Sequence, residues 1–151
     1  MSPAIPAGFT IASGEPGGLV IVFLLGRVLF SAMFIMSGLN HFFRLRATAE
    51  AAESAGVPAP VAATLASGFI LLAGGLSVLL GVAVRAGTAL LVIFLLPTAF
   101  IMHRFWGLDD PAASQNQLAH FLKNLVMAGA ALMIHYFTAV APEAWHHAVG
   151  P

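Results

Sequence analysis

The chain has 151 residues, of which 60% are hydrophobic and only 8% are charged. Soluble domains carry about 25% charged residues, so this composition excludes an ordinary water-facing surface and indicates a membrane protein. The six basic and six acidic residues cancel, which removes the electrostatic basis for nucleic-acid binding. The absence of cysteine excludes disulfides, thiol redox chemistry, thiolate metal sites and iron–sulfur clusters.

Four long apolar runs divide the chain, at about residues 18–43, 57–84, 86–106 and 117–140. Each run approaches or exceeds the roughly 20 residues that a transmembrane helix needs. Because lipid offers the backbone no hydrogen-bond partners and no run alternates like a strand, we expect helices. The predicted fold class is all-α, an integral membrane four-transmembrane-helix bundle. Residues 18–140 should form its single domain, between an N-terminal tail (1–17) without signal-peptide character and a C-terminal tail (141–151).

The connections between the runs carry their own signals. In residues 44–56 the stretch TAEAAESA predicts a short surface helix that ends near Gly56 and Pro58. Gly81 and Arg85 mark a tight turn between the second and third runs. The stretch GLDDPAASQNQ supplies turn and N-cap residues before the fourth run.

The distribution of cations predicts the orientation in the membrane. An even number of spans places both termini on one side. Most cationic side chains lie in or beside the two longer connections, namely Arg44, Arg46, Arg104 and Lys123. The opposite side has only Arg85, with Arg27 deeper in the first run. The positive-inside rule then predicts that the longer connections face the cytoplasm and that both termini lie outside.

Arg27 is the unusual residue of the first run, because a charge at this depth costs at least about 2.5–3.5 kcal/mol unless it faces protein or water. Ser31, Gly38 and His41 share its helical face, which predicts a seam that faces protein. No acidic residue lies inside any run, so Arg27 either ties helices together through carbonyls or contacts a ligand or subunit. The candidate partners of Arg27 are carbonyls freed by a kink at Pro97, polar groups such as His135, the N-terminal Glu15, a bound anion, or a neighbouring subunit.

Polar side chains from three runs should meet at one membrane face, because antiparallel helices bring their corresponding ends together. These residues are Asn40, His41, His103, Arg104, Gln117, His120, Lys123 and Asn124. A mouth dominated by histidines and cations would favour an anion, a quinone headgroup or a lipid phosphate. The alternative interpretation is that these side chains are ordinary interfacial anchors. No metal site is expected, since no helix offers two closely spaced ligands and no carboxylate joins the histidines.

Several segments together resemble a known family. They are GRVLFSAMFIMSGLNHF in the first run, GVPAP before the second, SGFILLAGGLSVLLGVAVRAGTALL across the second and third, and HFLKNLVMAGAALMI in the fourth. In this order they resemble the DoxX family of small bacterial membrane proteins, over about residues 19–137. Many members carry lysine where Asn40 or His41 stands here. The positions that match are Arg27, Gly38, His120, Lys123 and Asn124.

The resemblance implies a four-helix protein of the bacterial inner membrane, with relatives linked to thiosulfate:quinone oxidoreduction and to partner redox enzymes. Our first hypothesis is accordingly a multi-pass subunit of a redox-linked assembly, not catalytic alone, that binds a quinone headgroup or lipid anion. In that role His120 or His41 would exchange protons, and Lys123 or Arg27 would stabilise a reduced, anionic headgroup. The candidate ligand-binding residues are Arg27, Asn40, His41, His103, His120, Lys123 and Asn124, and none is assigned a catalytic role.

Two other functions stay open. The chain has no motif that carries electrons and no expected cofactor beyond the quinone, so it needs partner subunits for redox chemistry. It could instead be a purely structural accessory subunit that docks on a larger membrane complex, or on copies of itself. The third hypothesis, a small-solute transporter, is disfavoured because no intramembrane acid or discontinuous helix marks a solute path. In each case the partners are membrane lipids and other membrane proteins, not nucleic acid.

Overall fold

The computed structural model of the chain describes residues 16–142 and Trp145. Within them the fold consists of five helices: α1 (Pro16–Phe43), α2 (Leu45–Ser54), α3 (Pro60–Leu80), α4 (Val84–Met102) and α5 (Pro111–Val140). All except α2 are long and apolar enough to cross a membrane. The predicted fold class, an all-α membrane protein with four transmembrane helices, is confirmed.

The helix ends differ from the predicted spans where local capping decides them. The last helix begins six residues before the predicted position 117, because Asp110 caps it and Pro111 occupies its first position. The Asp110 carboxylate accepts hydrogen bonds from the N–H groups of Ala112 (3.0 Å) and Ala113 (3.3 Å). The segment expected as a turn is therefore helical from its proline onward. Helix α3 ends at Leu80 rather than at residue 84, because Gly81 adopts a left-handed conformation with φ of 74°.

The predicted surface helix is confirmed as α2, which ends shortly before Gly56. It buries only Ala49 and Ala52, and its main packing partner is α3. An amphipathic helix of this kind lies along a membrane face rather than across it. Helix α2 thus covers one end of the bundle.

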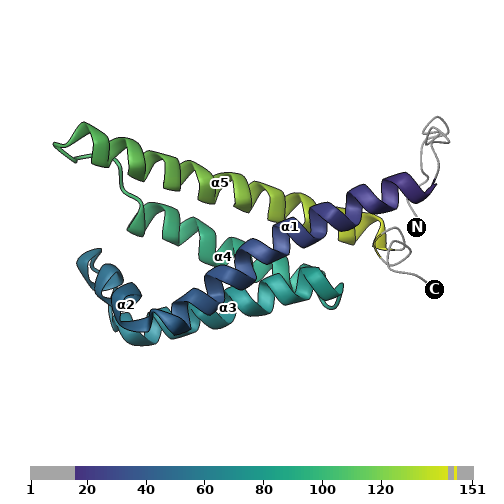
Figure 1. Ribbon diagram of the computed structural model, residues 1–151, viewed down its shortest axis with the longest axis horizontal. Coiled ribbons are helices and arrows are strands. Elements are labelled where there is room, and N and C mark those ends of the chain that lie inside the picture. Colours follow the sequence, from purple (N-terminus) through teal and green to yellow (C-terminus); the bar gives the residue numbers. More distant parts are fainter. Residues whose placement is uncertain (1–15, 143–144, 146–151) are drawn as a thin grey trace.

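The four long helices form two pairs (Figure 1). Helix α1 packs on α3, and α4 packs on α5, while α3 and α4 join the two pairs. Toward the end that carries α2 the pairs lie apart in the view, and toward the α3–α4 turn they come together. The central core draws on all four long helices, with Phe34, Leu71, Leu91, Leu95, Ala128 and Ala131 buried in one cluster.

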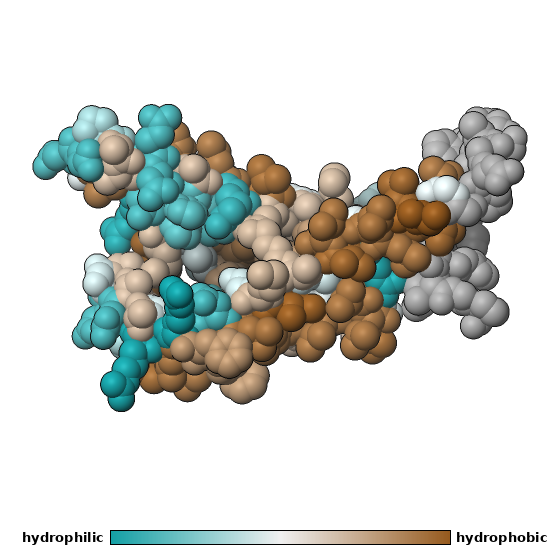
Figure 2. Space-filling view, in the orientation of Figure 1, coloured by the Kyte–Doolittle hydropathy of each residue, from teal (hydrophilic) through white to brown (hydrophobic). Residues whose placement is uncertain are grey.

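Small residues permit the close helix contacts. A Cβ atom on Gly74 of α3 would lie 2.5 Å from the Leu91 side chain and 3.0 Å from the Gly87 carbonyl oxygen of α4. A Cβ atom on Gly38 of α1 would lie 3.0 Å from the carbonyl oxygen of Gly68 in α3. These distances leave no room for a residue larger than glycine. Small residues of this kind allow helices to approach each other closely in lipid. The apolar side chains that remain outside cover most of the surface, and the hydrophilic residues gather at the α2 end (Figure 2).

Candidate ligand-binding cavity

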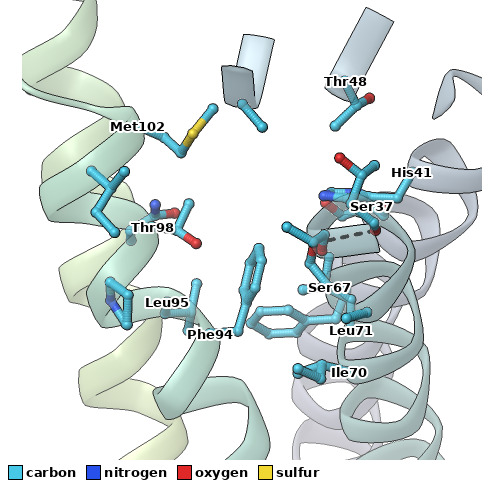
Figure 3. A pocket seen from close by; sticks show the side chains of 18 of the residues that line it. Ser37, His41, Thr48, Ser67, Ile70, Leu71, Phe94, Leu95, Thr98 and Met102 are labelled. Atoms are coloured by element: carbon cyan, nitrogen blue, oxygen red, sulfur yellow. Dashed lines mark hydrogen bonds between the residues drawn. The ribbon is translucent and has the colours of Figure 1, made fainter. Parts of the chain in front are cut away.

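A cavity of about 480 Å³ lies between the two helix pairs at the α2 end. Figure 3 shows its two walls, with Ser37, His41 and Ser67 on one side and Thr98 and Met102 on the other. Thr48 of α2 stands at the mouth. The cavity therefore takes residues from all five helices and sits where the pairs separate.

The cavity has an apolar inner part and a polar outer part. Its apolar lining includes Phe34, Leu71, Phe94, Leu95 and Met127. Its polar lining consists of Ser37, His41, Thr48, Thr64, Ser67, Thr98, His103, Lys123 and Asn124. A largely apolar pocket with a few convergent polar groups is the usual form of a small-molecule site.

Asn124 is the most constrained polar group in the wall. It is only 5% exposed, and its Nδ2 atom has no hydrogen-bond partner among the described residues. The amide lies on the buried face of α5, one turn before Ala128. Leaving such a donor unsatisfied in an apolar interior costs roughly 1–3 kcal/mol. Asn124 is therefore a lining residue of the cavity whose amide nitrogen has no partner within the described part of the chain.

The hydrogen-bonding role of one ring nitrogen of His41, Nδ1, is fixed by the backbone. Its Nδ1 atom lies 2.8 Å from the carbonyl oxygen of Ser37, one helical turn earlier. Because a carbonyl oxygen only accepts, Nδ1 must carry the hydrogen, and in the neutral ring Nε2 is then an acceptor. The ring also meets Phe94 edge-on, with centroids 6.2 Å apart across the cavity.

A second group of polar residues joins α4 and α5 beside the cavity. The rings of His103 and His120 stack at 5.1 Å, and His103 Nδ1 lies 3.0 Å from Gln117 Oε1. Lys123 Nζ lies 3.3 Å from His120 Nδ1, so the ammonium donates to the neutral ring. Of these residues, His103 and Lys123 line the cavity. His120 does not line it but contacts Lys123, which does. No group of three potential ligands among the described residues could hold a metal ion.

Besides His120, two of the predicted site residues do not line the cavity. Asn40 is exposed on α1 and does not line the cavity. Arg27 lies at the other end of the bundle, where its Nε donates to the Val78 carbonyl oxygen at 2.7 Å. The expectation that Arg27 shares one opening with His120 and Lys123 is therefore wrong.

The separation along α1 explains the position of Arg27. His41 follows Arg27 by 14 positions, which is about 21 Å of helix. The partner of Arg27 is a carbonyl of α3, near the turn into α4, and not the carbonyl that Pro97 leaves free in the other half of α4. Of the two interpretations given to Arg27, the tie between helices through a carbonyl is the one that the structure contains.

The sequence analysis missed the hydroxyl side chains of the cavity. Thr64 and Ser67 come from the small-residue helix α3, and Thr98 follows the helix-interior Pro97. Ser67 donates to the Ala63 carbonyl oxygen at 2.6 Å. A signal was present, because Thr64, Ser67 and Leu71 recur at helical spacing. Small hydroxyl residues in such helices usually pack against neighbours, so the pattern did not distinguish a cavity wall from a contact.

The sequence model of the DoxX family matches residues 22–104, which is more than half of the chain. The chain belongs to the DoxX family. It is also similar to the inner membrane protein YphA of Escherichia coli (strain K12), with 26% identity over 114 residues that make up 76% of this chain and 81% of that protein. No solved structure matches it. This DoxX family member is thus a multi-pass protein of the bacterial inner membrane.

The family match covers α1 from residue 22 onward together with α2, α3 and α4, and so includes His41 and His103 from the two walls of the cavity. Helix α5, which supplies Lys123 and Asn124, lies beyond it. The similarity to YphA extends over 114 residues. Neither comparison assigns a ligand to the cavity.

Proposed function

We propose that this DoxX family protein is a membrane subunit of a redox-linked assembly and that it holds a quinone headgroup in the cavity between its helix pairs. The observation that carries the proposal is the buried Asn124 side chain in the cavity wall, whose Nδ2 atom has no partner among the described residues. Quinone carbonyl oxygens accept hydrogen bonds and do not donate them. An unpaired N–H₂ group in an apolar wall is therefore a complementary partner for such a headgroup.

The shape of the cavity supports the same ligand class. An apolar wall of Phe34, Leu71, Phe94 and Met127 would surround the ring of the headgroup. Ile93 also lines the cavity and is 64% exposed on the outer surface of the bundle. A lipid-soluble tail could leave toward the acyl chains past this residue.

The polar residues at the mouth would orient the headgroup. Lys123 Nζ offers a charged donor beside Asn124, and His41 Nε2 offers a site that takes up a proton. A bound quinone would supply electron transfer, for which the side chains of this chain have no group of their own. The electrons would then come from and go to partner subunits, as the first of our hypotheses requires.

The test replaces Asn124 with leucine, which keeps the volume and removes the donor. The full-length chain is purified in mild detergent, and binding of decylubiquinone is measured by calorimetry. We expect Asn124→Leu to weaken binding on the order of tenfold, because one desolvated hydrogen bond is lost. The melting temperature should stay equal or rise, since the substitution also removes an unsatisfied buried group.

The matched control is Asn40→Leu, which changes the same residue type on an exposed position of α1 outside the cavity. It should leave quinone binding unchanged. If Asn124→Leu binds decylubiquinone as tightly as the natural chain while its fold is intact, the proposed function is wrong and a purely structural role is favoured.

A further inference from the structure

A second cavity, of about 690 Å³, lies at the opposite end of the bundle from the quinone cavity. Its walls come from the α3–α4 turn, the first turn of α4, the end of α5 and Trp145. Gly81, Arg85 and His135 are among the residues that line it. Our proposed function makes no use of this cavity.

Two buried side chains at this end carry N–H groups that have no partner within the described residues. Arg27 is 5% exposed, and after its Nε bond to Val78 its Nη1 and Nη2 atoms have no hydrogen-bond partner among the described residues. Trp145 is 4% exposed, and its Nε1 atom is likewise unpartnered within the described part of the chain. The two side chains lie together, with Arg27 Cζ 5.2 Å from the centre of the Trp145 ring.

Both donors converge on Gly81 in the cavity wall. A Cβ atom at Gly81 would lie 2.5 Å from Arg27 Nη2 and 3.4 Å from Trp145 Nε1. Gly81 also has a φ of 74°, a conformation that favours glycine. Trp145 lines the cavity together with Gly81, and the Arg27 guanidinium lies directly behind Gly81, with no side chain between them.

The rest of the wall is also suited to negative charge. Helix α4 begins here, and its N-cap residue Ala83 has no side chain that could accept from the free N–H groups of the first turn. Arg85 is exposed at the rim, and His135 Nδ1 lies 3.1 Å from the Arg85 carbonyl oxygen. No carboxylate lines the cavity among the described residues. A helix start and an arginine fork together are the usual elements of an oxyanion site.

We propose that this cavity binds a phosphate group, through Arg27, Trp145 and the first turn of α4. The volume exceeds that of a single ion, and the site lies at the helix ends where the headgroups of a bilayer lie. The phosphate therefore belongs to a phospholipid headgroup or to free inorganic phosphate. The phosphate would satisfy the buried guanidinium that no acidic residue inside the spans can reach.

The test measures phosphate-dependent binding to the full-length chain in mild detergent by native mass spectrometry. Three probes are compared: phosphatidylglycerol, inorganic phosphate, and dioleoylglycerol, which has the acyl chains without the phosphate. We expect phosphatidylglycerol to bind and dioleoylglycerol not to bind. If inorganic phosphate below about 10 mM, an order-of-magnitude mark for weak anion sites, displaces phosphatidylglycerol, the natural ligand is free phosphate. If it does not displace the lipid, the natural ligand is the phospholipid headgroup.

Two conservative variants test the residues. Trp145→Phe removes the indole N–H and keeps the ring that packs edge-on against Phe23. Arg27→Lys keeps the charge and removes the fork. Each should weaken phosphatidylglycerol binding about tenfold or more, as expected for one hydrogen bond to a charged group. The matched controls Trp106→Phe and Arg104→Lys, at the other end of the bundle, should bind as the natural chain does.

Three results would overturn the proposal. The first is unchanged phosphatidylglycerol binding in both Trp145→Phe and Arg27→Lys. The second is equally tight binding of dioleoylglycerol. The third is phosphate binding that appears only when Glu15 and Glu143, which lie outside the described residues, are both replaced by glutamine. In that case a carboxylate of the chain itself would be the partner of Arg27.

Discussion

At the scale of single residues, Arg27 and Asn124 pose the same physical problem at opposite ends of the bundle. Each is buried and each keeps N–H groups without a partner in the described structure. In lipid such groups are costly, because no water reaches them. Each such group calls for a partner beyond the described residues, which is why both sites lead to proposals about ligands.

Leu91 allows a prediction about the core itself. It is fully buried, and its side chain lies against Gly74. We expect Leu91→Ala to reduce the free energy of unfolding by about 2 kcal/mol, near the low end of the range for buried leucines. The loss is small because lipid is as apolar as the protein core, so the substitution removes packing contacts but little hydrophobic free energy. Thermal unfolding in detergent measures the change.

The control for Leu91 is Leu132→Ala on α5, where the side chain is 53% exposed to the membrane. This variant should unfold close to the temperature of the natural chain. Equal destabilisation by both substitutions would mean that Leu91 does not have the packed position described above.

At the scale of helices, the joint between α3 and α4 holds the two pairs together. It depends on Gly74 and Gly87 facing each other, because a Cβ atom on Gly74 would approach both the Leu91 side chain and the α4 backbone. Backbone atoms cannot move aside as a flexible side chain can. The joint therefore sets how far the pairs separate toward the α2 end and how wide the cavity is.

We predict that Gly74→Ala lowers the free energy of unfolding by about 1–3 kcal/mol, the usual cost of overpacking. It should also change quinone binding, since α3 and α4 supply opposite walls of the cavity. The same substitution at Gly129 of α5 is the control, because a Cβ atom there meets nothing within 4 Å. Gly129→Ala should be neutral or slightly stabilising through helix propensity. A fully stable Gly74→Ala protein would contradict the close contact.

At the scale of the whole molecule, the two ends of the bundle differ in chemistry. The α2 end combines histidines, Lys123 and the cavity proposed to hold a quinone, and the other end combines Arg27, Trp145 and the start of α4. Hydrophilic residues concentrate at the α2 end (Figure 2). The two proposed sites would therefore face opposite sides of the membrane.

The positive-inside rule assigns those sides, and the absence of cysteine makes the assignment easy to test. We expect Val82→Cys, in the exposed α3–α4 turn, to react with a membrane-impermeant maleimide in intact cells. Ser54→Cys, exposed on α2, should react only after the inner membrane is opened. The natural chain provides a background without thiols. The reverse labelling pattern would place the cavity proposed for quinone toward the outside.

The sequence by itself determined the class, the number of spans and the short helix α2, because length, apolar runs and turn residues are local properties. It also brought His103, His120 and Lys123 to one membrane face, since antiparallel helices leave no other arrangement. Only the tertiary structure decided which helices pair, and so which polar residues line a cavity. Helix pairing in lipid depends on the fit between small residues such as Gly74 and Gly87, and no single-helix pattern contains it. For the same reason the partner of Arg27, a carbonyl of α3, became visible only once α1 and α3 were seen packed together.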